Sequence, residues 1–152
     1  MKFKIVSPLL CAAFMICSSS AYATPPQSPK NIVIAMFDAF NRHDVDALVS
    51  LYAETAVLVS PDYCQPKHGK AAVREIYSGL FAAIPDVHDN LQTLIVSGDT
   101  VAVEFIATGQ MGDFAIHQPI AAFIQVQNGL IVRDTGYFDT GTENQCSSES
   151  EK

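Results

Sequence analysis

The sequence predicts an α+β domain in which a curved, cone-shaped sheet, antiparallel or mixed, wraps around about three N-terminal helices. Two observations predict this class. Apolar residues recur at helical spacing in the first half of the chain, up to Pro85. After Leu91 they alternate at strand spacing, and two hairpin signals, Gly98-Asp99 and Asn128-Gly129, separate the runs.

The first 23 residues have the pattern of a secretory signal peptide. Lys2 and Lys4 precede an apolar run at 5–17, and Ala21-Tyr22-Ala23 forms a cleavage site. That run is too short to cross a bilayer, so it is not a membrane anchor. We therefore expect an exported protein, periplasmic or secreted, whose mature chain begins at Thr24.

The mature chain is strongly acidic. Removing Lys2 and Lys4 from the 9 basic residues leaves 7 against 16 acidic ones, a net charge of −9. Such a charge repels the phosphates of nucleic acids and of anionic lipids, so neither is an expected partner. The remaining length suits one domain, predicted over 24–140, followed by a polar, Ser/Glu-rich tail at 141–152.

Three helices are expected in the first half. Ser28, with Pro29 in the first turn, caps a helix whose apolar stripe includes Met36 and Phe40. Asp44 caps a second, short helix. A third and most clearly amphipathic helix follows Gly69 and ends at Pro85. Strands are expected at 56–60, 91–96, 101–107, 120–126 and 130–138, with an irregular loop at 61–68.

Short motifs occur at 53–57, Ala-Glu-Thr-Ala-Val, and in the following Pro61, Pro66, Gly69, 71–75 (Ala-Ala-Val-Arg-Glu) and Tyr77. These motifs resemble ketosteroid isomerase without a gap. They therefore resemble the nuclear transport factor 2-like superfamily, which also includes SnoaL-like polyketide cyclases and limonene epoxide hydrolases. Pro119-Ile120 with Phe123, and a last strand ending Tyr137-Phe138-Asp139, are also typical. The resemblance covers about residues 29–139 and implies the fold, since these are mostly turn and core positions.

The catalytic residues of these relatives are not retained. The base of the isomerase falls on Ser60, its oxyanion-hole tyrosine on Met36 and its protonated aspartate on Ala121. In the hydrolase pattern, the water-holding residues fall on Leu58 and Ser60 and the arginine falls on Phe105. Its two aspartates fall on Ala107 and Gly136. Neither established route is therefore expected here.

An apolar cavity inside the cone is the expected ligand site. If Ala121 faces inward, strand alternation turns Phe123 and, on neighbouring strands, Phe105, Asp134 and Phe138 inward as well. The predicted ligand-binding residues are Met36, Phe40, Phe105, Ala121, Phe123 and Phe138. Asp134 would then be a desolvated carboxylate suited to act as a base. A register shifted by one would instead turn Asp134 outward and Arg133 and Tyr137 inward.

Three further residues are candidates for catalysis beside Asp134. Ser60 could bond a ligand or only cap the turn before Pro61, and Asp62 could replace the missing carboxylate or be an exposed loop residue. His117 could act at the cavity mouth as an acid or proton shuttle. Neither the histidines nor the cysteines have metal-ligand spacing, and there is no phosphate-binding glycine loop, so no metal and no cofactor are predicted.

Two features concern covalent structure and assembly. In an oxidising compartment, Cys64 and Cys146 are expected to form an intrachain disulfide. The outer face of the sheet is predicted to carry Ala102, Ile106, Ala122, Ile124 and Val126, which is too apolar for a monomer. Because relatives of this fold commonly pair through that face, a homodimer is expected.

Two functions remain open at this point. The chain could be an exported enzyme that transfers protons on a small, largely apolar carbonyl compound, as an isomerase, cyclase or dehydratase. It could equally be a non-catalytic module that uses the same fold to bind a small ligand or another protein. Convergence of Asp134 and a proton donor in one closed pocket would favour the enzyme.

Overall fold

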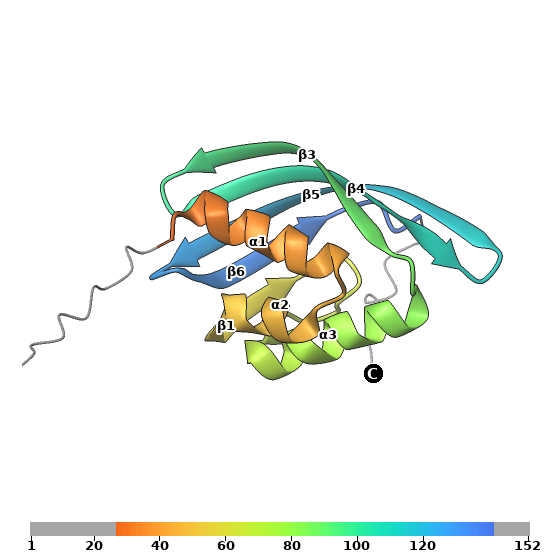
Figure 1. Cartoon of the computed structure of the whole chain (residues 1–152), viewed down its shortest axis with the longest axis horizontal. Helices are drawn as coiled ribbons and strands as arrows, with labels where there is room; N and C mark the ends of the chain where they lie inside the picture. Colours follow the sequence, from red (N-terminus) through yellow and green to blue (C-terminus); the bar gives the residue numbers. More distant parts are fainter. Residues whose placement is uncertain (1–26, 142–152) are drawn as a thin grey trace, which may run out of the picture.

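The computed structural model describes residues 27–141, so the predicted signal peptide, Cys146 and nearly all of the predicted tail lie outside the described residues. Helices precede most of the strands, as predicted (Figure 1). The elements are α1 (Pro29–Asn41), α2 (Val45–Leu51), β1 (Tyr52–Val59), β2 (Lys67–His68), α3 (Gly69–Ala83), β3 (His88–Ser97), β4 (Thr100–Met111), β5 (Phe114–Gln127) and β6 (Leu130–Tyr137).

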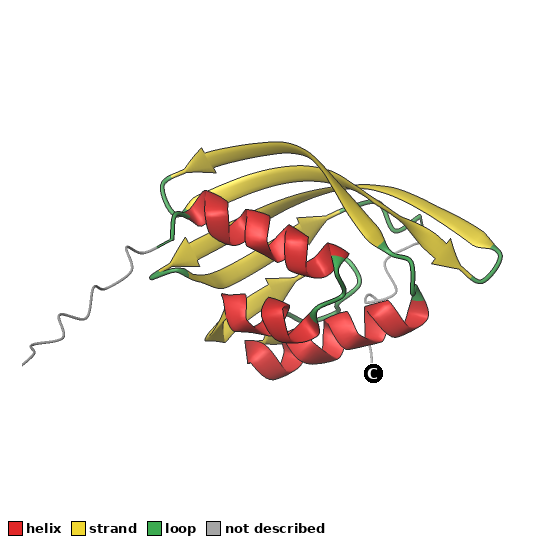
Figure 2. Cartoon of the chain, in the orientation of Figure 1, coloured by secondary structure: helices red, strands yellow, loops and turns green. Residues whose placement is uncertain are grey.

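The predicted α+β class is confirmed. The strands form one mixed sheet in the order β2-β1-β6-β5-β4-β3, in which β1 and β6 are parallel and the other neighbours are antiparallel. The sheet is curved but not closed, and the three helices lie on its concave side (Figure 2). Its inner face and the helices enclose the core.

Each helix begins where the sequence predicts. The Ser28 hydroxyl oxygen accepts a hydrogen bond of 3.3 Å from the amide of Asn31, and Asp44 caps α2 in the same way. Gly69 starts α3 with a φ of +78°, and a Cβ there would lie 2.8 Å from the carbonyl oxygen of Glu54. Only glycine fits this close approach between α3 and β1.

The long β4–β5 hairpin was only partly predicted. Both strands continue past the expected ends and turn at Gly112-Asp113, and the short strand β2 lies in the expected loop. Pro119 lies within β5, a position that argues against a strand in the sequence. It is tolerated because β6 pairs with β5 only as far as Ala121, so the missing amide of Pro119 lies on a free edge.

The predicted orientation of β5 is wrong. Ala122, Ile124 and Val126 are buried in the core, whereas Ala121 is exposed and Phe123 is 50% exposed on the outer face. The polar Gln125 and Gln127 share the outer face with Phe123, so packing the opposite face buries the more continuous apolar set. Consequently Ala122, Ile124 and Val126 cannot belong to an outer dimer face, whereas Ala102 and Ile106 lie on the outer face as predicted.

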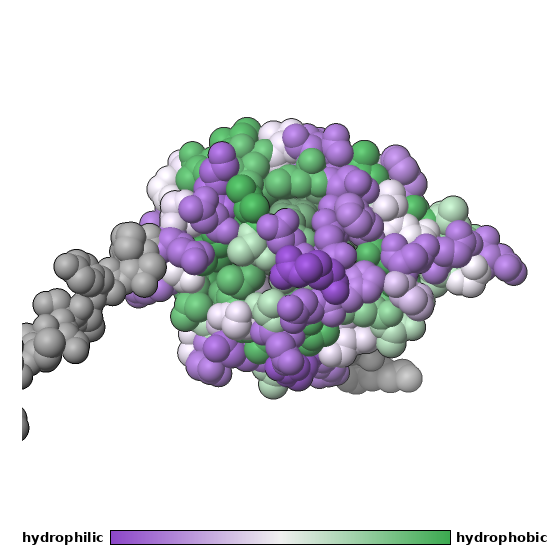
Figure 3. All heavy atoms as spheres, viewed as in Figure 1, coloured by the Kyte–Doolittle hydropathy of each residue, from purple (hydrophilic) through white to green (hydrophobic). Residues whose placement is uncertain are grey.

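Exposed apolar side chains occur on strand β3 at one edge of the sheet. Figure 3 shows apolar surface, interrupted by polar groups, along the upper border of the molecule, where β3 runs in Figure 1. Ile95 is the most exposed apolar residue of β3, at 62%. Within residues 27–141, no helix combines the length and apolar character needed to span a membrane.

Candidate functional site

A cavity of about 520 Å³ lies between the inner face of the sheet and helices α1 and α3. Its wall is largely apolar and includes four phenylalanines and several aliphatic residues. Its polar side chains are Ser60, Asp62, Tyr63, Tyr77, Asp89, Gln118 and Asp134. Asp62 and Met111 are exposed residues of the lining, which places them at the mouth. An apolar pocket with a few convergent polar groups is the usual form of a small-molecule site.

Four of the six residues predicted to contact a ligand line this cavity. They are Met36 and Phe40 from α1, Phe105 from β4, and Phe138 just after β6. Ala121 and Phe123 do not line it, because β5 turns Ile120, Ala122 and Ile124 inward instead. Phe123 packs edge-to-face on Tyr137 outside the sheet, with ring centroids 6.1 Å apart.

Asp134 is held inside the cavity by a short chain of tyrosines. The hydroxyl of Tyr52 donates a hydrogen bond of 2.7 Å to Oδ2 of Asp134, and the hydroxyl of Tyr77 lies 3.1 Å from that of Tyr52. Since Tyr52 has one hydroxyl hydrogen and directs it to the carboxylate, Tyr77 is the donor to Tyr52. The sulfur of Met36 lies 3.4 Å from the Tyr52 hydroxyl. The chain fixes the orientation of the carboxylate.

Oδ1 of Asp134 has no hydrogen-bond partner among the described residues. Every fully buried polar side-chain atom of these residues does have a partner, so Oδ1 is not fully buried. Oδ1 is therefore open to the cavity. Burial raises the pKa of Asp134, and the hydrogen bond from Tyr52 opposes that rise. Burial and the nearby Asp134 raise the pKa of Tyr52 and of Tyr77 well above the usual value for a phenol, so both stay protonated.

The other three predicted catalytic residues are placed differently from one another. Ser60 and Asp62 both line the cavity, and the Ser60 hydroxyl accepts a 3.4 Å bond from the amide of Asp62. Partial burial raises the pKa of Asp62. His117 is exposed and points to the outer face, because its neighbours Ile116 and Gln118 point inward. The prediction that His117 reaches the cavity mouth is therefore wrong.

Four polar residues of the cavity were not predicted as site residues, namely Tyr63, Tyr77, Asp89 and Gln118. Asp89 lines it from β3, and burial raises its pKa to about 7. Tyr63 lines it from the loop after β1, and burial together with the nearby Asp134 and Asp62 raises its pKa to about 12. The Tyr63 hydroxyl has no hydrogen-bond partner in the described part of the chain. The apolar run predicts this strand only from Leu91, whereas β3 begins at His88. Asp89 could have been found only by extending the predicted strand back to His88.

Reciprocal bonds to Asn41 fix the backbone of Asp89. The side-chain amide of Asn41 donates to the Asp89 carbonyl at 2.9 Å, and its oxygen accepts from the Asp89 amide at 2.8 Å. Asn41 is the last residue of α1, so this pair joins the helix to strand β3. The carboxylate of Asp89 itself makes no hydrogen bond or ion pair within residues 27–141.

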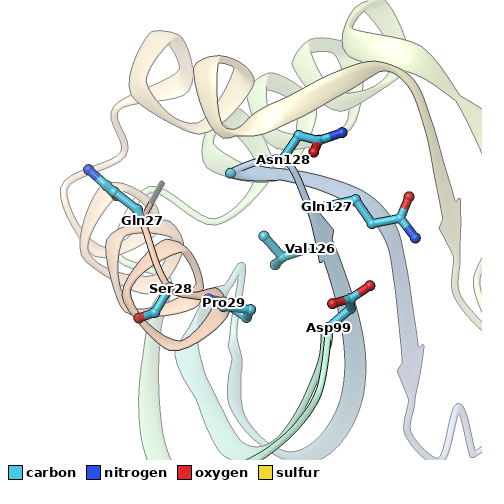
Figure 4. Close-up of a pocket in the computed structure, with 8 residues that line it drawn as sticks. Gln27, Ser28, Pro29, Asp99, Val126, Gln127 and Asn128 are labelled. Carbon is cyan, nitrogen blue, oxygen red and sulfur yellow. The ribbon is translucent and has the colours of Figure 1, made fainter. Parts of the chain in front are cut away.

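A second hollow, of about 500 Å³, lies at the surface where α1 begins (Figure 4). Asp99, Gln127 and Asn128 from the two hairpin turns line it together with Gln27 to Pro29, and it shares no residue with the cavity. In the described part of the chain, no group of three or more His, Cys, Asp or Glu side chains could hold a metal ion. The absence of a metal and of a cofactor stays a prediction.

The chain belongs to the SnoaL-like domain family, whose model matches residues 33–134. This match agrees with the resemblance seen in the sequence motifs. The matched range contains the lining residues of the cavity from Met36 to Asp134. No curated protein matches the sequence significantly.

Solved structures share the fold at low sequence identity. A hypothetical protein with a ketosteroid isomerase-like fold from Catenulispora acidiphila, in complex with trimethylamine, is 22% identical with a TM-score of 0.68, covering 75% of this chain and 88% of that one. A protein of unknown function with a cystatin-like fold from Xanthomonas campestris is 18% identical, with a TM-score of 0.69 and coverages of 79% and 98%. The epoxide hydrolase/cyclase-like enzyme SalBIII, associated with pyran ring formation in the polyether salinomycin, is 23% identical, with a TM-score of 0.67 and coverages of 74% and 92%.

Proposed function

We propose that this protein binds a small, largely apolar carbonyl compound in its cavity and transfers a proton on it without a cofactor. The observation that carries this proposal is the carboxylate of Asp134, which opens one oxygen to an apolar cavity while Tyr52 holds the other. Family membership supports a reaction of the isomerase or cyclase type. The predicted export of the chain stays part of the proposal.

The proposed reaction begins with proton abstraction. Oδ1 of Asp134 takes a proton from the carbon beside the carbonyl group, and the electron pair of that C–H bond moves onto the carbonyl oxygen to form an enolate. A carboxylate with a raised pKa is a stronger base than an ordinary one, which suits it to this step. Return of the proton to another carbon or another face gives the isomerised product.

The enolate oxygen needs a hydrogen-bond donor. The Tyr63 hydroxyl is available, since it has no partner within the described residues and lies near enough to Asp134 for the carboxylate to raise its pKa. Ser60 is a second donor on the same wall. We assign these two side chains to substrate binding and to stabilising the developing negative charge.

Menthone provides a direct test, because enolisation and return of the proton to the opposite face convert it to isomenthone. We expect the purified mature protein to speed this conversion, followed by gas chromatography, and Asp134→Asn to slow it by about 100-fold or more. Asp62→Asn is the matched control, since it removes the same charge at the mouth and should retain most of the activity.

A non-catalytic binding module remains the second candidate. It is favoured by Met36 and Ser60, which line the cavity at the positions where the isomerase carries its tyrosine and its base. Under this candidate, ketones bind but neither the protein nor Asp134→Asn raises the rate of conversion above that of buffer. Binding without acceleration for menthone and a panel of cyclic ketones would decide for this module.

We also propose a homodimer that forms through an outer patch consisting of Ile95, Ala102, Phe123 and Tyr137. Ile95, Ala102 and Phe123 lie side by side on neighbouring strands, and Tyr137 contacts Phe123. A patch of this kind with three large, exposed apolar side chains is unusual on a monomer. We also propose the intrachain disulfide between Cys64 and Cys146.

A further inference from the structure

The charges that face the cavity are all of one sign. Asp62, Asp89 and Asp134 are the ionisable side chains with carboxylates in its lining, and no Lys, Arg or His lines it. The two ion pairs of the described residues, Lys70 with Glu54 and Arg74 with Asp46, involve none of these carboxylates. The cavity therefore offers negative charge and aromatic faces without any cation of its own.

The carboxylates of Asp62 and Asp89 both lack a partner among the described residues, and Asp89 is the more buried of the two. Asn41 fixes its backbone through two hydrogen bonds, so the position of the carboxylate is set by the fold. No described group donates to the side chain, in contrast to Asp134, which Tyr52 satisfies in part. Partial burial of a carboxylate without a partner disfavours its charged form, and the pKa of Asp89 accordingly rises to about 7.

Tyr77 adds a second acceptor to the lining of the same cavity. Its hydroxyl hydrogen is directed to Tyr52, so the remaining lone pair of its oxygen is free to accept. Asp89 is close enough to contribute to the raised pKa of Tyr77. A ligand group that donates hydrogen bonds and carries positive charge suits either acceptor, whereas a carbonyl oxygen suits neither.

Asp89 and Asp134 lie toward opposite ends of the inner face of the sheet. Asp89 pairs with Ala107 of β4. Asp134 pairs with Ile124 of β5, which in turn pairs with Val101 of β4, so these three residues form one row across the sheet. Val101 and Ala107 are six residues apart on that strand. Phe105 lies between the two rows on the same face and gives the cavity an apolar middle. A single ligand that reaches both carboxylates is therefore elongated.

We infer that the cavity selects an elongated, apolar molecule with one protonated amine, and that Asp89 is the counter-ion of this amine. Ammonium groups bind carboxylates and aromatic faces together in sites that exclude water. This inference rests on the proposed use of the cavity and adds the substrate class: the amine lies at Asp89 and the reacting carbon at Asp134.

The test compares menthylamine, menthol and menthone, which share one carbon skeleton but carry an ammonium, a hydroxyl and a carbonyl group. Isothermal titration calorimetry is performed on the mature protein at a pH above the pKa of Asp89. We expect menthylamine to bind at least about tenfold more tightly than menthol, and Asp89→Asn to remove this difference. Asp89→Ala is a second variant, and the unfolding transition of each variant establishes that it is folded.

Two matched variants isolate the position of the charge. Asp62→Asn removes one negative charge from the mouth, and Asp134→Asn removes one from the other end; both should retain the preference for menthylamine. Loss of the preference in either variant, to the same extent as in Asp89→Asn, overturns the assignment to Asp89.

The outcomes separate this inference from the proposed function. If menthone and menthol bind but menthylamine binds no better, the amine inference is wrong and the proposed proton transfer stands. If menthylamine binds preferentially but menthone is not converted, the inference stands and the binding module replaces the enzyme. If none of the three compounds binds, both the inference and the proposed function are contradicted.

Discussion

The Tyr52 hydroxyl donates a 2.7 Å hydrogen bond to Oδ2 of Asp134, and this contact joins the first residue of β1 to the middle of the parallel neighbour β6. The two residues are 82 positions apart in the chain. The tyrosine is fully buried, so the fold gives Asp134 one fixed donor and leaves its other oxygen to the cavity. Such a carboxylate is held in orientation without being neutralised by a cation.

Replacing this donor should expose the cost of the buried carboxylate. Tyr52→Phe removes a hydrogen bond to a charged group, so we expect a loss of about 1.5–3 kcal/mol in the free energy of unfolding when Asp134 is ionised. The pKa of Asp134 should rise further, because the Tyr52 bond is what lowers it. Urea unfolding at several pH values measures both effects. Tyr77→Phe is the control, and an equal loss in the two variants would contradict a special role for the Tyr52–Asp134 contact.

Most of the fold was predictable because it depends on local signals. Caps such as Ser28 and Asp44 and the left-handed residues Asn128 and Gly129 determine where elements begin and turn, and each acts within a few residues. Family resemblance implied the fold, but the order of the strands and the parallel pairing of β1 with β6 were not predicted. The extension of β4 and β5 was not predictable in this way, since Pro119 argues against a strand unless the end of β6 is known.

The site was predicted less completely. Alternation along β6 placed Asp134 on the inner face, where it lies, whereas the same reasoning on β5 started from the wrong residue and turned Ala121 and Phe123 inward. The polar Gln125 and Gln127 would have indicated the observed register. The partner of Asp134, Tyr52, could not be inferred, because its contact depends on the packing of β1 against β6 and not on spacing in the sequence.

Asp89 should make stability depend on pH in the neutral range. Its pKa is about 7 in the folded protein and about 3.9 when unfolded, so the folded state binds the proton more tightly. Stability is then highest below about pH 4 for this group, falls as pH rises to about 7, and is constant above that value. Each unit of pKa difference corresponds to about 1.4 kcal/mol in the free energy of unfolding. Because the side chain of Asp89 is partly exposed, the total loss of stability is smaller than the full pKa difference would give.

Asp89→Asn should therefore be more stable than the wild type at and above neutral pH. The gain should shrink as the pH falls toward about 4, where Asp89 is protonated in both states. Thermal unfolding of the two proteins across this range measures the difference. Asp62→Asn serves as the control for net charge. A gain that persists unchanged at low pH would show that titration of Asp89 is not its cause.

The proposed disulfide should contribute substantially to stability in the mature protein. Closing the long loop between Cys64 and Cys146 is worth about 4 kcal/mol in the chain-entropy model. We expect Cys64→Ser to lower the melting temperature, and reducing agent to lower that of the wild type but not that of the variant. Titration of the oxidised wild type with a thiol reagent provides the check, and two reactive thiols per mature chain would refute the pairing.

The outer patch gives a prediction about assembly. Phe123 is 50% exposed and Tyr137 55% exposed, and the two rings pack together on the outer face of the sheet. Phe123→Glu places a charge in the middle of this patch, so we expect it to shift a dimer to a monomer in light scattering, without lowering the melting temperature of the isolated chain. Ser78→Glu, an exposed substitution on α3, adds the same charge elsewhere and should leave the dimer intact. A wild-type protein that is monomeric at micromolar concentration would contradict the dimer. A Phe123→Glu variant that remains a dimer would place the contact elsewhere, because a buried glutamate without a partner destabilises an interface by several kcal/mol.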